Sequence, residues 1–360
     1  MNPKILDLYT DYLISSFSYT TATGLSRLTD GKVSHDKITR FLREEDLGSR
    51  QLWKAVKPLV RNIESPEGCL IVDDTIEEKP YTDLSEIVQF YFDHSKGRTV
   101  KGICLVNVLY CPENGAVALP VSYEIVKKDK IIKDNKTGLD KAVSTVSKNE
   151  LYRRQLQRLN KVLKFKYVLN DLWYASSENM MFVKRELNKD FVMGLKSNRH
   201  VYLSIYDKRK DNYVEVRNIK LKKSDTLKIY LEGVDFPLLL IRRVFHNEDG
   251  STGTLYLVTS NLTLSSNEIY GIYQKRWKIE EYHKSIKQNA SLEMSPTKTV
   301  RTQRNHIFAS ILAFIKLQIL KVNKKMNHFA IKSQIYLQAL RSAYQEYRRM
   351  SDLIKNYNFA

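Results

Sequence analysis

Two short apolar runs that lead directly into aspartate constrain the fold of this chain more than any other feature. Residues 69–72 run into Asp73, and residues 167–170 run into Asp171. Short apolar runs bounded by polar residues are typical of buried strands. Further strand patterns at 100–110 and 116–125 alternate with helical patterns along the chain. The sequence therefore predicts an α/β fold with a mixed sheet flanked by helices.

The pattern of hydrophobic residues divides the chain into several segments. Residues 1–66 predict a small N-terminal helical domain, in which Ser34 caps one helix and Ser49 caps another. A DNA-reading helix-turn-helix and a plain helical bundle both fit this domain. The strand patterns that follow are expected in one domain of residues 67–199 and 261–322. Residues 200–260 predict an inserted antiparallel β module. Residues 323–360 predict a C-terminal helical segment and a candidate dimerisation element.

The charge balance indicates a polyanionic partner. The chain has 59 basic and 40 acidic residues, a net charge of +19, and nucleic acid is the commonest large polyanion. A membrane surface is disfavoured because the basic residues are spread along the chain, and no apolar run approaches the roughly 18 residues of a spanning helix. Three cysteines in apolar runs predict reduced core residues in a cytoplasmic protein. The lysine-rich residues 127–136 predict an exposed loop.

Five polar residues in the last third of the chain predict one stripe on a single helix. Tyr273, Arg276, Glu280, Lys284 and Lys287 project within an arc of about 80° at 100° per residue. One carboxylate among three basic side chains is the arrangement needed to place a metal ligand against phosphates. The alternative is a solvated helix face laced by ion pairs, each worth a few tenths of a kcal/mol.

Two strands that lead into aspartate, followed by a helical glutamate, predict a metal-dependent phosphodiesterase. Asp73, Asp171 and Glu280 are the candidate ligands. Magnesium and manganese favour carboxylate oxygens, and two cations about 4 Å apart promote phosphodiester cleavage. The first ligand is either Asp73 or Asp74. Strand alternation places Asp73 and Thr75 on one face and Asp74 on the other, and does not by itself decide between the two aspartates.

The same residues resemble a known family. Tyr273, Arg276, Glu280 and Lys287 match the signature Tyr-x2-Arg-x3-Glu-x6-Lys without gaps. That signature belongs to the IS-four-like cut-and-paste insertion-sequence transposases of the DDE type, whose catalytic domain is ribonuclease-H-like. Two upstream blocks also resemble that family: Asp73-Asp74-Thr75 its Asp-x-Thr motif, and Asp171-Leu172-Trp173-Tyr174 its Asp-x-Trp-Tyr motif. The Asp-x-Thr motif selects Asp73 over Asp74 as the first ligand, and strand alternation agrees with this choice.

The resemblance implies a DNA transposase that binds the inverted repeats of its own element. It implies two Mg²⁺ ions per active site, with Mn²⁺ as a substitute, held by the three carboxylates. It also implies cleavage of the ends through a hairpin intermediate, joining of the 3′ hydroxyls to target DNA, a homodimer, and a place on a prokaryotic nucleoid. No membrane and no small-molecule cofactor are expected.

The resemblance also implies which residues contact double-stranded DNA. Arg276, Lys284 and Lys287 are expected at phosphates near the transposon end, and Tyr273 is expected to hydrogen-bond a phosphate. Trp277 is expected either beside the terminal bases or in the core. Trp173 is either an aromatic wedge or, as we favour, part of the core beneath the site.

Two other functions fit the same residues. A ribonuclease-H-like nuclease would cleave DNA but leave no integrated joints. A domesticated DNA-binding protein would have lost activity, but a binding module has no need of three intact metal ligands. Short inverted repeats around the gene would favour a transposase, and their absence would favour the domesticated protein.

Overall fold

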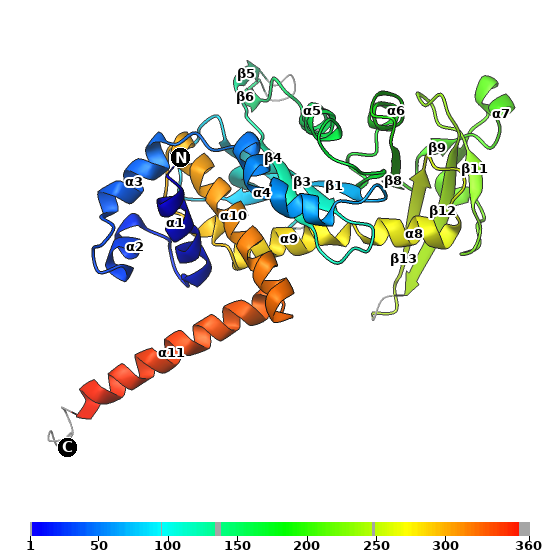
Figure 1. Ribbon diagram of the computed structural model, residues 1–360. Helices are drawn as coiled ribbons and strands as arrows, with labels where there is room; N and C mark the ends of the chain where they lie inside the picture. The colour runs from blue at the N-terminus through cyan, green and yellow to red at the C-terminus, as the bar shows by residue number, and fades with distance from the viewer. Residues whose placement is uncertain (1, 95, 134–137, 247–248, 353–360) are drawn as a thin grey trace. The chain divides into compact units, whose positions relative to one another are not determined.

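The protein is described by a computed structural model at residues 2–94, 96–133, 138–246 and 249–352 (Figure 1). Contacts between residues group the chain into two compact units. One unit is residues 49–281, and the other joins residues 1–48 to residues 282–360. The sheet belongs to the first unit, and the second is helical.

The first unit is built on a nine-stranded sheet. Its order is β11-β12-β13-β8-β7-β1-β3-β2, with β4 also paired to β3. The strands are β1 (Cys69–Glu78), β2 (Val88–Asp93), β3 (Arg98–Cys111), β4 (Leu119–Ile125), β7 (Tyr167–Asn170), β8 (Asp190–Leu195), β11 (Leu227–Ile229), β12 (Leu238–His246) and β13 (Thr252–Thr259). Parallel and antiparallel pairs both occur, so the mixed α/β sheet expected from the sequence is confirmed.

The central strand β1 is longer than its sequence pattern suggests. We expected it to end at Asp73, but it continues to Glu78 because β3 pairs with it along its whole length. On its other side, the parallel strand β7 ends at Asn170, opposite Val72. Asp73 is therefore the first residue of β1 beyond the end of β7. Asp171 directly follows β7 at the same edge.

The antiparallel strands after residue 200 differ from the separate β module that we expected. β12 pairs with β13, and β13 pairs with β8, so these strands extend the main sheet. Hydrogen bonding to β8 covers an edge that would otherwise be open. Only β9 (His200–Val201) and β10 (Val214–Glu215) form a small sheet apart from it within the described part of this region.

Helices flank the sheet on both sides (Figure 1). They are α4 (Ser49–Ile63), α5 (Lys148–Asn160), α6 (Ser177–Met181) with a π-helical turn at Phe182–Glu186, α7 (Ile205–Arg209), α8 (Ser266–Gln274) and the start of α9 (Trp277–Gln288). Ser49 is the first residue of α4, but its hydroxyl bonds to the backbone of Tyr123 on β4 instead of capping the helix as the sequence predicts. α4 packs against β4 and groups with the sheet. The capping box of Ser265 and Glu268 that opens α8 is confirmed.

The second unit contains α1 (Pro3–Ser15), α2 (Ala22–Leu28), α3 (His35–Glu44), α10 (Val300–Lys324) and α11 (His328–Asp352). Ser34 caps α3, and the apolar side of that helix is buried, as predicted. Of the described helices, α10 alone is long and apolar enough to cross a membrane, and 67% of its apolar window is buried. α1 and α3 pack against it. Such burial is typical of a core helix, so no membrane is indicated.

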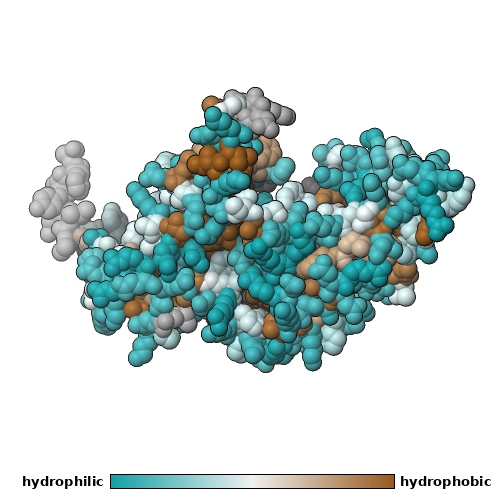
Figure 2. Space-filling view, turned by 90° about the horizontal axis from the view of Figure 1, so that it is seen from above, coloured by the Kyte–Doolittle hydropathy of each residue, from teal (hydrophilic) through white to brown (hydrophobic). Residues whose placement is uncertain are grey.

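The lysine-rich segment 127–136 is only partly the loop that we expected. Lys130–Lys133 forms strand β5, which pairs with β6 (Asp140–Val143), while residues 134–136 lie outside the described residues. The three cysteines are buried and free, as predicted. Hydrophilic residues predominate on the face drawn in Figure 2, with hydrophobic ones gathered in patches between them.

Candidate active site

Asp73 lies in the middle of β1, opposite Asn107 of β3. Its Oδ1 accepts a hydrogen bond of 2.8 Å from the backbone N–H of Asp74. Its Oδ2 lies 3.9 Å from Nη1 of Arg276, and only 15% of its side chain is exposed. Asp74 is adjacent in sequence but points to the other face of the strand, where Lys148 Nζ lies 2.6 Å from its Oδ2.

Asp171 lies in the loop that follows β7. Its Oδ1 accepts hydrogen bonds from the backbone N–H groups of Trp173 at 2.9 Å and Tyr174 at 3.4 Å. Adjacent strands are about 4.8 Å apart, and Val72 and Asn170 are paired across β1 and β7. The residues that follow this pair, Asp73 on β1 and Asp171 after β7, are therefore neighbours at the carboxyl end of β7.

Glu280 comes from the first turn of α9. The single continuous helix that we expected from residue 273 to 287 is wrong, because Lys275 and Arg276 separate α8 from α9. The backbone N–H groups of Lys275 and Arg276 bond to carbonyls three residues earlier, which tightens the chain between the two helices. Tyr273 thus lies at the end of α8, and Glu280 lies one turn into the next helix.

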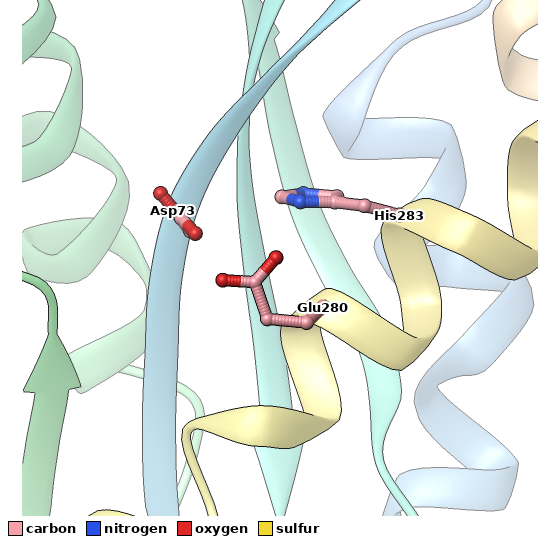
Figure 3. A group of neighbouring side chains, drawn as sticks. All are labelled: Asp73, Glu280 and His283. Atoms are coloured by element: carbon pink, nitrogen blue, oxygen red, sulfur yellow. The ribbon is translucent and has the colours of Figure 1, made fainter. Parts of the chain in front are cut away.

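The carboxylates of Asp73 and Glu280 point toward each other (Figure 3), and their ligand oxygens lie within 4.8 Å. His283 projects from the next turn of α9, beside Glu280. Asp171 is not in this tight group within the described part of the chain. Its side chain is turned back toward its own loop by the two hydrogen bonds from that loop. The structure thus brings two of the three predicted ligands into direct opposition.

The acidic side chains of the site disfavour each other's ionisation. Burial and the negative charge of Asp171 raise the pKa of Asp73 well above its usual range. Burial likewise raises the pKa of Asp171, against the opposing effects of its backbone hydrogen bonds and of Arg276. Arg276 Nη1 lies 3.1 Å from Glu280 Oε1, so its guanidinium partly neutralises the cluster. A bound cation would relieve the same repulsion more completely.

The three basic residues of the predicted stripe have different surroundings. The Arg276 side chain is 16% exposed and faces Asp73 and Glu280. Lys287 Nζ lies 3.2 Å from Glu293 Oε1. Lys284 lies over the ring of Phe329 at 5.2 Å. Arg276 is therefore placed directly at the carboxylates, whereas the two lysines contact groups in the helical unit.

The aromatic residues near the site are divided between core and surface. Tyr273 is buried, so the alternative of a solvated helix face does not hold for this residue. Gly194 on β8 leaves room for the Tyr273 hydroxyl, because a Cβ at Gly194 would lie 3.4 Å from that oxygen. Trp277 is 63% exposed and Trp173 is 46% exposed, so the core reading of both is wrong. A cavity of about 380 Å³ adjoins Arg276; it is lined by Phe245, Leu255, Tyr270, Tyr273, Gln274, Arg276 and Trp277.

Sequence reasoning missed the partners of Asp74. Lys148 lies at the start of α5, 74 residues further along the chain, and Tyr174 lies 100 residues further along. Strand alternation shows only that Asp74 leaves the face of Asp73. No spacing in the sequence indicates which side chains meet it there.

Comparison with known proteins links the chain to one family. A family model described as DDE superfamily endonuclease matches residues 4–213, which include Asp73 and Asp171 and end before Glu280. Among solved structures, the Drosophila P element transposase strand transfer complex is similar with 10% identity and a TM-score of 0.27. That match covers 55% of this chain and 45% of the other. No curated protein matches the chain.

Proposed function

Because the chain belongs to the DDE superfamily endonucleases, we propose that it is a DNA transposase that cleaves the ends of its own insertion sequence. The observation that carries this proposal is the opposition of Asp73 and Glu280 at the edge where Asp171 follows β7. Three carboxylates from two neighbouring strands and one helix form the donor set that metal-dependent phosphodiester cleavage requires.

The order of the strands supports a ribonuclease-H-like catalytic domain. Running from β4 through β3, β1 and β7 to β8, three antiparallel strands are followed by two that are parallel to β1. The proposed ligands sit on the first strand in the chain, after the first of the parallel strands, and on a helix near the end of the domain. This topology brings together three proposed ligands, Asp73, Asp171 and Glu280, that are far apart in the sequence.

The residues present fit a pair of divalent cations. Asp73, Asp171 and Glu280 offer hard oxygen ligands, which suit Mg²⁺, with Mn²⁺ as a substitute. When bound, the two ions would activate the attacking hydroxyl and stabilise the leaving 3′ oxygen. Asp73 and Glu280 already face each other, and Asp171 would join them by rotating away from its loop. Arg276 would then be released from Glu280 to hold a phosphate oxygen.

Several groups beside the carboxylates are suited to DNA. Arg276 is a bidentate phosphate donor, and Tyr273 supplies a hydroxyl at the same place. The exposed ring of Trp277 offers a face on which a terminal base can stack. Lys284 and Lys287 lie further along α9 and would contact phosphates of the DNA backbone beyond the scissile one. The net charge of +19 supports the affinity of all these contacts.

The later steps of the proposed reaction follow from this site. Cleavage through a hairpin on the transposon end, and joining of the freed 3′ hydroxyls to target DNA, would use the same carboxylates in succession. A homodimer would hold the two ends together, acting on double-stranded DNA at a prokaryotic nucleoid. No small-molecule cofactor takes part in these steps.

The test uses supercoiled DNA that carries the sequences flanking the gene. We expect the full chain to cleave this donor in Mg²⁺ and to form integrated joints with a target. Asp171→Asn should reduce cleavage to background while retaining binding, because affinity rests on many phosphate contacts. Asp235→Asn is the matched control, since this exposed carboxylate pairs only with Arg185 among the salt bridges of the described residues.

Each outcome separates the competing functions. Normal cleavage by the Asp171→Asn variant would disprove the active site. Cleavage by the parent without integrated joints would favour a nuclease that does not transfer strands. Binding to the flanking repeats without cleavage in either metal would indicate a domesticated DNA-binding protein.

A further inference from the structure

We propose that Asp74 is a positioning residue that holds the Asp171 loop against β1 through the hydroxyl of Tyr174. The proposal rests on the proposed function, in which Asp73 and Asp171 bind the same metal ions. Asp74 itself is placed away from those ions. It acts on them through the loop that carries Asp171.

The Asp74 carboxylate is engaged on both oxygens. Tyr174 donates its hydroxyl hydrogen to Oδ1 at 2.9 Å. Lys148 Nζ donates to Oδ2 at 2.6 Å, and the Cys104 thiol lies 3.5 Å from the same oxygen. Only 17% of the Asp74 side chain is exposed. A carboxylate that is paired with a lysine and hydrogen-bonded by a tyrosine has little capacity left for a cation, so Asp74 is a poor metal ligand.

Tyr174 connects this carboxylate to the Asp171 loop. It is fully buried, and its backbone N–H donates to Asp171 Oδ1. Its carbonyl oxygen accepts a hydrogen bond of 2.9 Å from Asn179. Its ring stacks on Tyr152 with the centroids 5.2 Å apart. Tyr174 therefore bonds to Asp171 through its own backbone N–H and to Asp74 on β1 through its hydroxyl.

The arrangement couples the two proposed ligands mechanically. Asp73 and Asp74 are consecutive on β1, so one strand presents one carboxylate to the metal face and the next to the Asp171 loop. A shift of Tyr174 would move Asp171 relative to Asp73. Mg²⁺ demands near-ideal octahedral geometry, so a small change in this separation should weaken binding. Partners that orient metal ligands in this way typically contribute 10–100-fold in affinity or activity.

The test is the affinity of the full chain for Mn²⁺, measured by titration calorimetry without DNA. Tyr174→Phe removes one hydroxyl and keeps the ring that stacks on Tyr152. We expect its dissociation constant for Mn²⁺ to rise about tenfold, with a melting temperature close to that of the control. The control is Tyr110→Phe, which removes the hydroxyl of another fully buried tyrosine, located on β3 and bonded to Ser65.

Two variants of Asp74 test the mechanism further. Asp74→Asn keeps an oxygen that accepts the Tyr174 hydrogen bond, whereas Asp74→Ala removes it. The Asn variant should therefore bind Mn²⁺ more tightly than the Ala variant. Equal weakening by both, with no effect of Tyr174→Phe, would make Asp74 a direct ligand and overturn the proposal.

The result also separates this inference from the proposed function. An unchanged Mn²⁺ affinity in Tyr174→Phe would overturn the positioning role even if the parent chain cleaves DNA. A parent that binds Mn²⁺ but cleaves no DNA would contradict the proposed function. The comparison of Mn²⁺ affinities would then still decide the role of Asp74.

Discussion

At the scale of single residues, burial and mutual repulsion act together on the acidic side chains of the site. Asp73 is mostly buried, and Asp171 and Glu280 add negative charge near it. Partial relief comes from Arg276, whose guanidinium contacts Asp73 and Glu280. Ionisation of these carboxylates is therefore unfavourable in the protein without a bound cation. Such raised pKa values are typical of sites that bind cations or perform catalysis.

This repulsion predicts a pH-dependent stability. The folded pKa of Asp73 is raised, so the stability that its protonated form contributes is present at acidic pH and is lost as pH rises through the folded pKa. Asp73→Asn should therefore melt a few degrees higher than the parent at pH 8 without metal. The difference should shrink toward pH 4. Thermal melts by circular dichroism in EDTA would measure it.

A control of opposite sign is Asp207, whose pKa is lowered by hydrogen bonds from Ser204 and Asn212. Its contribution to stability is present at neutral pH and is lost as pH falls through the folded pKa. Asp207→Asn should therefore destabilise the protein slightly at pH 8. Stabilisation by both substitutions to the same degree would mean that general charge reduction, and not the environment of Asp73, explains the result.

At the scale of elements, the division between α8 and α9 decides which basic side chains reach the carboxylates. The short segment at Lys275 and Arg276 ends one helix and starts the next. Arg276 lies in this segment and contacts both Asp73 and Glu280. Lys287, near the end of α9, instead lies beside Glu293. The basic residues of the stripe are thus expected to differ in function.

Lys287 is predicted to contact a phosphate beyond the scissile one. Lys287→Ala should weaken binding to the transposon end and lower the salt slope by about one unit, as expected for one lost phosphate contact. Its effect on cleavage should exceed its effect on binding, because a slightly misplaced phosphate misaligns with the site. Filter binding at several salt concentrations, with parallel cleavage assays, would measure both effects.

Glu293→Gln is the matched variant, because it removes the same ion pair and leaves the lysine in place. It should bind DNA at least as well as the parent. Both side chains of this pair are partly exposed, and ion pairs at the protein surface contribute only about 0–1 kcal/mol to stability. If both variants melted well below the parent and bound DNA normally, Lys287 would have a structural role instead.

At the scale of the whole molecule, α11 carries an apolar stripe on its exposed surface. Leu337, Leu340, Tyr344 and Tyr347 follow one another at spacings of three and four residues, and each is 46–64% exposed. This is the a/d spacing of a coiled coil. Transposition needs two ends held together, so we propose a second copy of this chain as the partner of the stripe.

Leu340→Arg should therefore abolish the dimer that we expect for the parent in sedimentation experiments, because a charge would enter the helix contact. Ser342→Arg introduces the same side chain about 200° away on α11 and should leave the dimer intact. Strand joining should fail in Leu340→Arg, while binding to a single end should persist. A parent that is monomeric both alone and with two ends would contradict the prediction.

The sequence by itself determined the parts of this protein that depend on local pattern. Hydrophobic runs identify β1 and β7 and the aspartates that follow the runs, and capping residues mark the starts of α3 and α8. Strand alternation places Asp73 and Asp74 on opposite faces of β1. These features could be predicted because strand and helix periodicities relate residues that are close in the chain.

Only the tertiary structure decided how these parts meet. The extension of β1 beyond Asp73 depends on pairing with β3, and the addition of β12 and β13 to the main sheet depends on pairing with β8. The contacts of Asp74 with Lys148 and Tyr174 join residues 74 and 100 positions apart. The break before α9 also escapes prediction, since helical periodicity continues through it. Pairing and packing between distant segments leave no spacing in the sequence, because their partners are chosen by the fold as a whole.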